Sequence, residues 1–117
     1  MDKLNAERIL DAIPACFDGL KADARAFRIL YKLKKSDGSF VCRTVVVGGG
    51  VCEILCQSSE DVDLTIRASE QDYLRIATGR LNLEIARWCG NIKYVGNNLL
   101  HLELNTYLSP PDSVYLM

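Results

Sequence analysis

The chain has 117 residues, of which 49% are hydrophobic and 25% charged, with 14 lysines and arginines against 15 acidic residues. This length favours one domain that buries about two-thirds of its unfolded surface, so disorder is not expected. A formal net charge of -1 gives no overall attraction to nucleic acids or anionic membranes, so a polyanionic partner would need a local patch. No apolar run approaches the roughly 20 residues of a membrane span, and no signal peptide is recognisable, so we expect a cytoplasmic protein.

The cysteine pattern indicates reduced thiols. Five cysteines, an odd number without a C-x-x-C pair, do not form a disulfide framework. Cys52 and Cys56 share a strand face with Ile54 and are expected in the core. The only histidine, His101, has no histidine or cysteine three to five residues away. We therefore predict no metal site and no cofactor.

The first predicted element is an amphipathic helix over residues 3–19, where apolar residues follow a helical period. Pro14 is expected to kink this helix or to begin a second short segment, because proline lacks the backbone N–H. Gly19 suits the end of the helix.

The period then changes to two, which is typical of strands with one buried face. The triplet Gly48-Gly49-Gly50 separates two such segments and is better explained as a hairpin turn than as a phosphate cradle, because no helix follows it. The predicted strands cover residues 26–34, 39–47, 51–57 and 62–68.

The remaining elements begin at polar residues that cap helices. Ser69 and Asp72 resemble a capping box, and Asn82 is suited to cap a second helix. In the last segment Leu100 and Leu104 fit a helix, although Leu100, Leu102 and Leu104 also alternate. These patterns predict helices at 70–78, 83–89 and 98–108, a fifth strand at 91–95, and a tail over 109–117.

Residues 63–105 carry a more specific pattern. Asp63 opens an alternating D-x-T-[ILV] strand, and residues 78–82 read T-G-R-L-N, followed four residues later by Ala86. Residues 90–97 then read G-N-I-K-Y-V-G-N before a leucine-spaced segment. This succession resembles the sterol carrier protein 2, or non-specific lipid-transfer protein, family, as a small stand-alone single-domain member.

The resemblance implies an α+β fold in which a five-stranded mixed sheet is covered on one face by helices, with an apolar tunnel between the layers. It implies a domain over residues 1–108 that binds and transfers fatty acids, acyl-CoAs, sterols or phospholipids without catalytic residues. Three positions depart from the family pattern, namely Leu83 in place of a proline, Arg87 in place of an apolar residue and Asn91 in place of a lysine. Arg87 would narrow the tunnel, project to solvent or bind an acidic lipid head.

The candidate lipid-binding residues are mostly apolar, as ligand sites are, although the same side chains would also fill an ordinary core. They are Phe17, Ile66, Tyr73, Ile76, Ala77, Ile85, Arg87, Trp88, Leu100, Leu104, Tyr107 and Leu108.

Several alternatives remain open. One alternative function is the presentation of a lipid-like intermediate, such as a polyprenyl quinone precursor, to partner enzymes. Another is a protein-interaction module with a filled core. No nucleophile with a base is visible, so an enzyme is disfavoured.

Transient membrane contact is compatible with the amphipathic first helix. A basic group on the first strand is explained best as a solvated face, next as a contact for membrane phosphates and least as a nucleic-acid site; it comprises Arg28, Lys32, Lys34 and Lys35.

Overall fold

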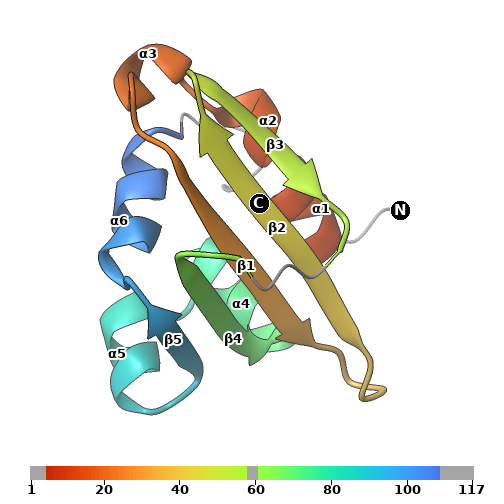
Figure 1. Cartoon of the computed structure of the whole chain (residues 1–117). Helices are drawn as coiled ribbons and strands as arrows, with labels where there is room; N and C mark the ends of the chain where they lie inside the picture. Colours follow the sequence, from red (N-terminus) through yellow and green to blue (C-terminus); the bar gives the residue numbers. More distant parts are fainter. Residues whose placement is uncertain (1–4, 58–60, 109–117) are drawn as a thin grey trace.

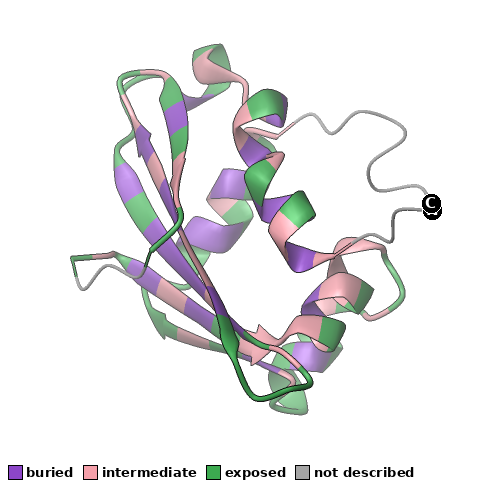
Figure 2. Cartoon of the chain, turned by 90° about the vertical axis from the view of Figure 1, so that its right-hand side faces the viewer, coloured by how far each residue is buried: buried purple, intermediate pink, exposed green. Residues whose placement is uncertain are grey.

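Five strands form one mixed sheet with helices on one side of it, in a computed structural model that describes residues 5–57 and 61–108 (Figures 1 and 2). The strands lie in the order β3-β2-β1-β4-β5, and only the β1–β4 pair is parallel. Their bounds are β1 Phe27–Lys34, β2 Phe40–Gly48, β3 Val51–Leu55, β4 Leu64–Ser69 and β5 Ile92–Gly96. The helices are α1 Ala6–Asp11, α2 Ile13–Cys16, α3 Gly19–Ala22, α4 Glu70–Ala77, α5 Leu83–Trp88 and α6 Leu99–Thr106. The predicted α+β fold, with a five-stranded mixed sheet covered on one face, is confirmed.

Side chains alternate across the sheet as the period of two predicts. Ile29, Tyr31 and Leu33 of the central strand β1 are almost completely buried on the helical face. On the outer face of the same strand, Lys32 is half-buried and Lys34 is exposed. The helical face therefore holds the core, and the outer face of β1 is more exposed to solvent except at Leu30, which is buried together with its β2 partner Thr44.

The N-terminal segment is not one continuous helix over residues 3–19, and the short helix α2 from Ile13 to Cys16 confirms the expectation that Pro14 would begin a second segment. Pro14 occupies the first turn of α2, where its missing N–H costs little, and Phe17 adopts an extended conformation that interrupts the helix. Asp18 then caps a new helix, since its Oδ1 accepts hydrogen bonds from the amides of Leu20 and Lys21. Gly19 begins α3 instead of ending the predicted helix.

The C-terminal helices begin at the predicted caps. Ser69 Oγ accepts the amide of Asp72 at 3.0 Å, and Asn82 Oδ1 accepts the amides of Glu84 and Ile85. Gly79 has a φ of 78° just beyond α4, where a left-handed residue ends the helix. The segment from Leu99 to Thr106 is helical, so the alternating pattern of its leucines is secondary to their helical spacing.

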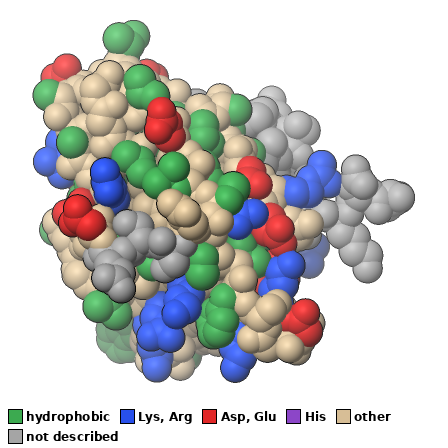
Figure 3. All heavy atoms as spheres, turned by 45° about the vertical axis from the view of Figure 1, so that its right-hand side comes forward, with side chains coloured by type: hydrophobic (Ala, Val, Ile, Leu, Met, Phe, Trp, Pro, Cys, Tyr) green, Lys and Arg blue, Asp and Glu red, His purple; other side chains and the backbone are tan. Residues whose placement is uncertain are grey.

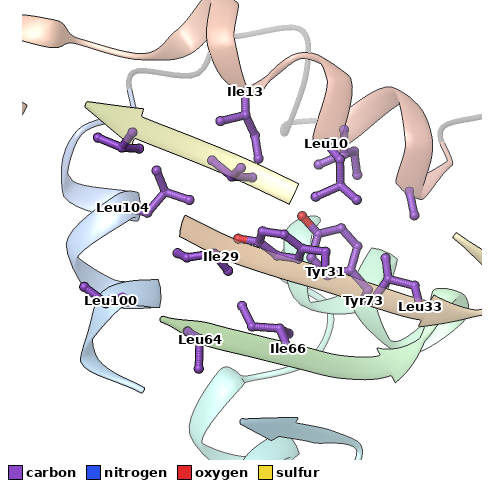
Figure 4. Close-up of a cluster of buried hydrophobic side chains, with 14 of the residues drawn as sticks. Leu10, Ile13, Ile29, Tyr31, Leu33, Leu64, Ile66, Tyr73, Leu100 and Leu104 are labelled. Atoms are coloured by element: carbon purple, nitrogen blue, oxygen red, sulfur yellow. The ribbon is translucent and has the colours of Figure 1, made fainter. Parts of the chain in front are cut away.

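One hydrophobic core joins the helices to the sheet. Figure 4 shows Leu10 and Ile13 opposite the strand side chains Ile29 and Ile66, with Leu104 of α6 at one end. Cys52 is buried as expected, but Cys56 lies beyond the end of β3 and is exposed, so its predicted place in the core is wrong.

Within the described ranges, no helix has the length and apolar character needed to cross a membrane. The predicted tail over residues 109–117 lies outside these ranges, so the domain boundary at residue 108 stays a prediction.

Gly19 permits a close approach between α3 and the β2–β3 turn. A Cβ at Gly19 would lie 2.1 Å from the carbonyl oxygen of Gly50, whereas a Cβ at Gly48 would make an ordinary 3.9 Å contact with the Cβ of Ala26. We expect Gly19→Ala to lower the free energy of unfolding by about 2 kcal/mol, because backbone must move. Gly48→Ala is the control, with a change below about 0.5 kcal/mol. Urea unfolding of both variants checks this, and equal stabilities would contradict it.

Candidate functional site

A partly open cavity of about 270 Å³ lies between the sheet and the helices. Strand β1 forms its floor, while α2, α4 and α6 supply most of its walls. The cavity is thus on the face of the sheet that Figure 2 shows covered by helices. Its lining consists of Ile13, Tyr31, Tyr73, Ile76, Ala77, Leu83, His101, Asn105 and Leu108.

Three rings from three elements meet at this cavity. Tyr31 points from the middle of β1 toward the helices, and Tyr73 reaches toward it from α4 (Figure 4). The Tyr31 ring stands edge-to-face with Tyr73 at 5.7 Å and with His101 of α6 at 6.1 Å, measured between ring centroids. Such edge-to-face pairs are favourable and hold each ring in a defined orientation. Together with Asn105, the rings supply the polar groups of a mostly apolar wall.

His101 is uncharged near neutral pH. Its side chain is buried, and its Nδ1 is hydrogen-bonded to the Tyr94 hydroxyl of β5. Burial, followed by the nearby Arg87 guanidinium, lowers the pKa of His101 from 6.5 to about 4. Burial also raises the pKa of Tyr94 to about 12. The hydrogen bond therefore joins two neutral groups.

The cavity lining contains no lysine, arginine, aspartate or glutamate. A buried guest with a formal charge would lose its hydration without gaining an ionic partner there. The lining is suited to an apolar group that carries at most a neutral hydrogen-bonding substituent.

The candidate residues from the sequence fall into three groups. Tyr73, Ile76, Ala77 and Leu108 line the cavity. Core residues of the sheet and α6 lie outside its lining and are fully or almost fully buried; they are Ile66, Leu100 and Leu104.

Phe17 and Tyr107, also candidates, contact each other beside the cavity. Their rings meet edge-to-face with centroids 6.2 Å apart. The amide of Asp18 donates to the carbonyl of Tyr107 at 2.7 Å, and Phe17 forms an antiparallel bridge with Leu108. These contacts join the α2–α3 connection to the end of α6.

The candidates on α5 point away from the cavity. Ile85 is 58% exposed and Trp88 is 88% exposed, and both line a separate shallow hollow with Glu84 and Cys89. Arg87 lies over the Tyr94 ring, with 5.1 Å from its Cζ to the ring centroid, and its Nη1 is 3.6 Å from Glu84 Oε1. Arg87 therefore lies near the surface and outside the cavity lining, and it does not narrow the cavity.

The sequence interpretation missed five lining residues. Leu83 was visible only as a departure from the family pattern, yet its larger side chain now forms part of the wall. Tyr31 could have been found as the hydroxyl-bearing residue on the inward face of the central strand. The others, Ile13, His101 and Asn105, gave no separate signal.

The cavity lining contains no cysteine and no cluster of metal-ligating side chains among the described residues. Among residues 5–57 and 61–108, no cluster of three His, Cys, Asp or Glu side chains could hold a metal ion. All five cysteines are free, and burial raises the pKa of Cys52 to about 11.

Comparison with curated proteins finds sterol carrier protein 2 of Rattus norvegicus, which is 31% identical over 87 residues, or 74% of this chain. The protein of the same name from Homo sapiens is 32% identical over 85 residues. The chain spans only 16% of the length of each of these relatives. No family model matches the chain.

Solved structures share the fold. The sterol carrier protein domain 2 of Helicoverpa armigera has a TM-score of 0.66 and 23% identity, over 85% of this chain and 79% of that chain. Palmitated SCP2L2 from Aedes aegypti has a TM-score of 0.62 and 20% identity, over 86% of each chain. The sec-alkylsulfatase Pisa1 from Pseudomonas sp. has a TM-score of 0.77 and 17% identity, over 92% of this chain but 17% of that enzyme.

The sulfatase match thus concerns a small part of a large enzyme and shows the fold alone. The two curated relatives and the insect structures carry the same family name, sterol carrier protein 2, and the insect structures share the fold of this chain. This chain is a sterol carrier protein 2-like domain.

Proposed function

We propose that the domain binds and transfers lipids by enclosing an apolar part of a fatty acid, acyl-CoA, sterol or phospholipid in the cavity beside Tyr31. The observation that carries this proposal is an apolar, uncharged and partly open cavity between sheet and helices. Such cavities with few polar groups are typical of small-molecule sites. The continuous apolar tunnel implied by the family resemblance remains a prediction.

The size of the cavity limits how much of a lipid enters. A cavity of about 150 Å³ accommodates one benzene ring, and small-molecule pockets usually measure about 300–1,000 Å³. At about 270 Å³, the cavity admits a segment of an acyl chain or part of a ring system. A charged head group would stay at the opening, because no cation lines the interior.

The relatives support an apolar guest. The Aedes aegypti structure is described as palmitated, and the curated relatives are named sterol carriers. We propose binding without catalysis, because His101, the histidine of the lining, is a poor base at neutral pH with a pKa of about 4.

The cavity favours lipid binding over the filled-core interaction module, since it exceeds the volume of a few methyl groups. Presentation of a lipid-like intermediate to partner enzymes would use the same cavity. Co-purification of enzymes with the protein, together with weak binding of plain fatty acids, would indicate that role instead.

Helix α5 is proposed to contact the membrane during loading. Trp88 and Ile85 expose large apolar surfaces side by side, and tryptophan is well suited to the boundary between apolar and aqueous phases. The hollow that they share with Glu84 and Cys89 is separate from the cavity, so this contact is distinct from the enclosed guest.

The cavity can be filled from α4. We expect Ala77→Phe to weaken binding of a fluorescent fatty acid at least about tenfold, because a phenyl ring occupies much of the space. Ala24→Phe adds the same ring at an exposed position and is the control.

For the unsubstituted protein, the affinity for fatty acids should rise about fourfold per added methylene until the cavity is full. Native mass spectrometry and lipid extraction complete the test. A purified protein that carries no lipid and does not bind fluorescent fatty acids would contradict the lipid-binding function.

Membrane contact can be followed by the fluorescence of Trp88, the sole tryptophan. We expect its emission to shift to shorter wavelength when phosphatidylcholine vesicles are added, because the exposed indole enters a less polar environment. Ile85→Ser should reduce the shift, and Val51→Ser, at an exposed residue of β3, serves as the control. An unchanged emission maximum at saturating vesicles would exclude contact through α5.

The buried His101 predicts a pH dependence of stability. Its folded pKa of about 4 lies below the unfolded value of 6.5, so the unfolded state binds the extra proton first. The free energy of unfolding should fall as pH decreases from 6.5 toward 4, by up to about 1.4 kcal/mol per pH unit. His101→Gln should flatten the profile between pH 6.5 and 5. Carboxylates with lowered pKa, such as Glu103, act only below that interval. A flat profile in the unsubstituted protein would refute this assignment.

A further inference from the structure

A row of positive charges crosses the outer face of the sheet, opposite to the cavity. The register places Lys32 of β1 beside Arg67 of β4, and Arg67 beside Lys93 of β5. Lys34 lies one pleat further along β1 on the same face. Like charges directly opposite each other destabilise a sheet. The row therefore carries an electrostatic cost that an anion would relieve.

These four cations lack the ion-pair partners that several other cations of the described residues have. In the described part of the chain, no carboxylate lies within ion-pair distance of Lys32, Lys34, Arg67 or Lys93. Cations elsewhere do have such partners, in the pairs Arg25–Glu103, Lys35–Glu7, Arg43–Asp11, Arg75–Asp72 and Arg87–Glu84. A net charge of -1 thus conceals a local excess of positive charge.

The four side chains line a shallow groove of about 440 Å³. Phe40 of β2 borders it on one side, and the turn at Gly90 and Asn91 borders it on the other. The Lys32 ammonium lies 5.1 Å from the centroid of the Phe40 ring, which restrains it at the edge of the groove. Figure 3 shows lysine and arginine side chains gathered in the lower part of the molecular surface.

The one carboxylate in the groove lining is already engaged. Asp72 Oδ1 pairs with Arg75 at 3.3 Å, and Asp72 Oδ2 accepts a hydrogen bond from the side-chain Nδ2 of Asn91 at 3.2 Å. The contact with Asn91 holds the α5–β5 turn against the start of α4. Asp72 thereby shapes the end of the groove without forming an ion pair with the four cations.

We propose that this groove binds an anion carrying two or more phosphate groups. Neighbouring strands lie about 4.8 Å apart, so the row from Lys32 to Lys93 spans about 10 Å, which is wide enough for more than one phosphate. The Arg67 guanidinium can bind two oxygens of one phosphate, while the lysines act as mobile point charges. The groove lies on the opposite face from the lipid cavity, so it is a separate site that does not depend on the proposed lipid function.

The direct test uses inorganic tripolyphosphate at about 0.15 M salt, the physiological ionic strength. We expect saturable binding by calorimetry and shifts of the backbone amide signals of Arg67 and Lys93 by NMR. The double variant Arg67→Gln/Lys93→Gln should bind at least about tenfold more weakly, because two charged contacts are lost. Lys21→Gln/Arg80→Gln removes the same charge from exposed positions outside the groove and should bind like the unsubstituted protein.

Folding and lipid binding are measured in parallel. The groove double variant should keep or raise the melting temperature, because opposed like charges are removed, and it should bind a fluorescent fatty acid unchanged. A purely structural role of Arg67 and Lys93 would lower the melting temperature instead. Failure of the phosphate site is thus distinguishable from failure of the lipid cavity.

Two further arms identify the source of the phosphates. Tighter binding of a nucleoside triphosphate than of tripolyphosphate indicates a soluble ligand. Binding to phosphatidylcholine vesicles that contain a phosphatidylinositol bisphosphate, reversed by tripolyphosphate and absent without that lipid, indicates a head group. The absence of saturable tripolyphosphate binding, or equal binding by the groove and control double variants, would overturn the proposal.

Discussion

The parallel pairing of β1 with β4 is the constraint on which the two faces of this molecule depend. Parallel neighbours cannot be joined by a tight turn, so the chain first completes the β1–β2–β3 meander and then returns to the other side of β1. Asp63 secures that return, because its amide donates to the carbonyl of Arg28 and its Oδ2 accepts the amide of Arg28, both at 2.9 Å. Its own carbonyl accepts the amide of Asn97 beyond β5, also at 2.9 Å. One aspartate thus links three strands, which accounts for the acidic residue that opens the D-x-T motif.

With β1 enclosed by neighbours on both sides, alternation along a single strand serves two sites. Tyr31 faces the helices and forms the floor of the neutral cavity, while the next residue, Lys32, faces the opposite side and joins the cation row. The two surfaces are separated by the thickness of one sheet. The uncharged cavity and the charged groove therefore draw on adjacent residues of one strand without sharing a side chain.

Much of the fold could be predicted because its signals are local. Strand alternation and the caps at Ser69 and Asn82 depend on neighbouring residues alone, and the structure has them as expected. The second segment at Pro14 was expected, but the interruption at Phe17 was not, since the helical period continues through Phe17 while the chain turns there to reach the end of α6.

The cavity was only partly predictable, because part of its wall depends on contacts between elements that are distant in sequence. Helical spacing showed that Tyr73, Ile76 and Ala77 of α4 face the sheet, and they line the cavity. It could not show whether the short helix α5 turns Ala86 or Trp88 inward; the structure buries Ala86 completely and leaves Trp88 exposed. The small residue allows α5 to lie close to the sheet, and that choice is made by packing between elements that are distant in sequence.

The junction of Phe17 and Asp18 with Tyr107 and Leu108 also bears on the order in which the chain can fold. The β1–β2 hairpin joins residues close in sequence and can form as soon as both strands have been synthesised. The α2–α3 connection has its partners near the other end of the described chain, and such distant contacts form slowly because a long loop must close first. The contacts beside the cavity therefore need residues from both ends of the described chain, whereas the β1–β2 hairpin needs only neighbouring ones. We expect the contacts with Tyr107 and Leu108 to form after the hairpin.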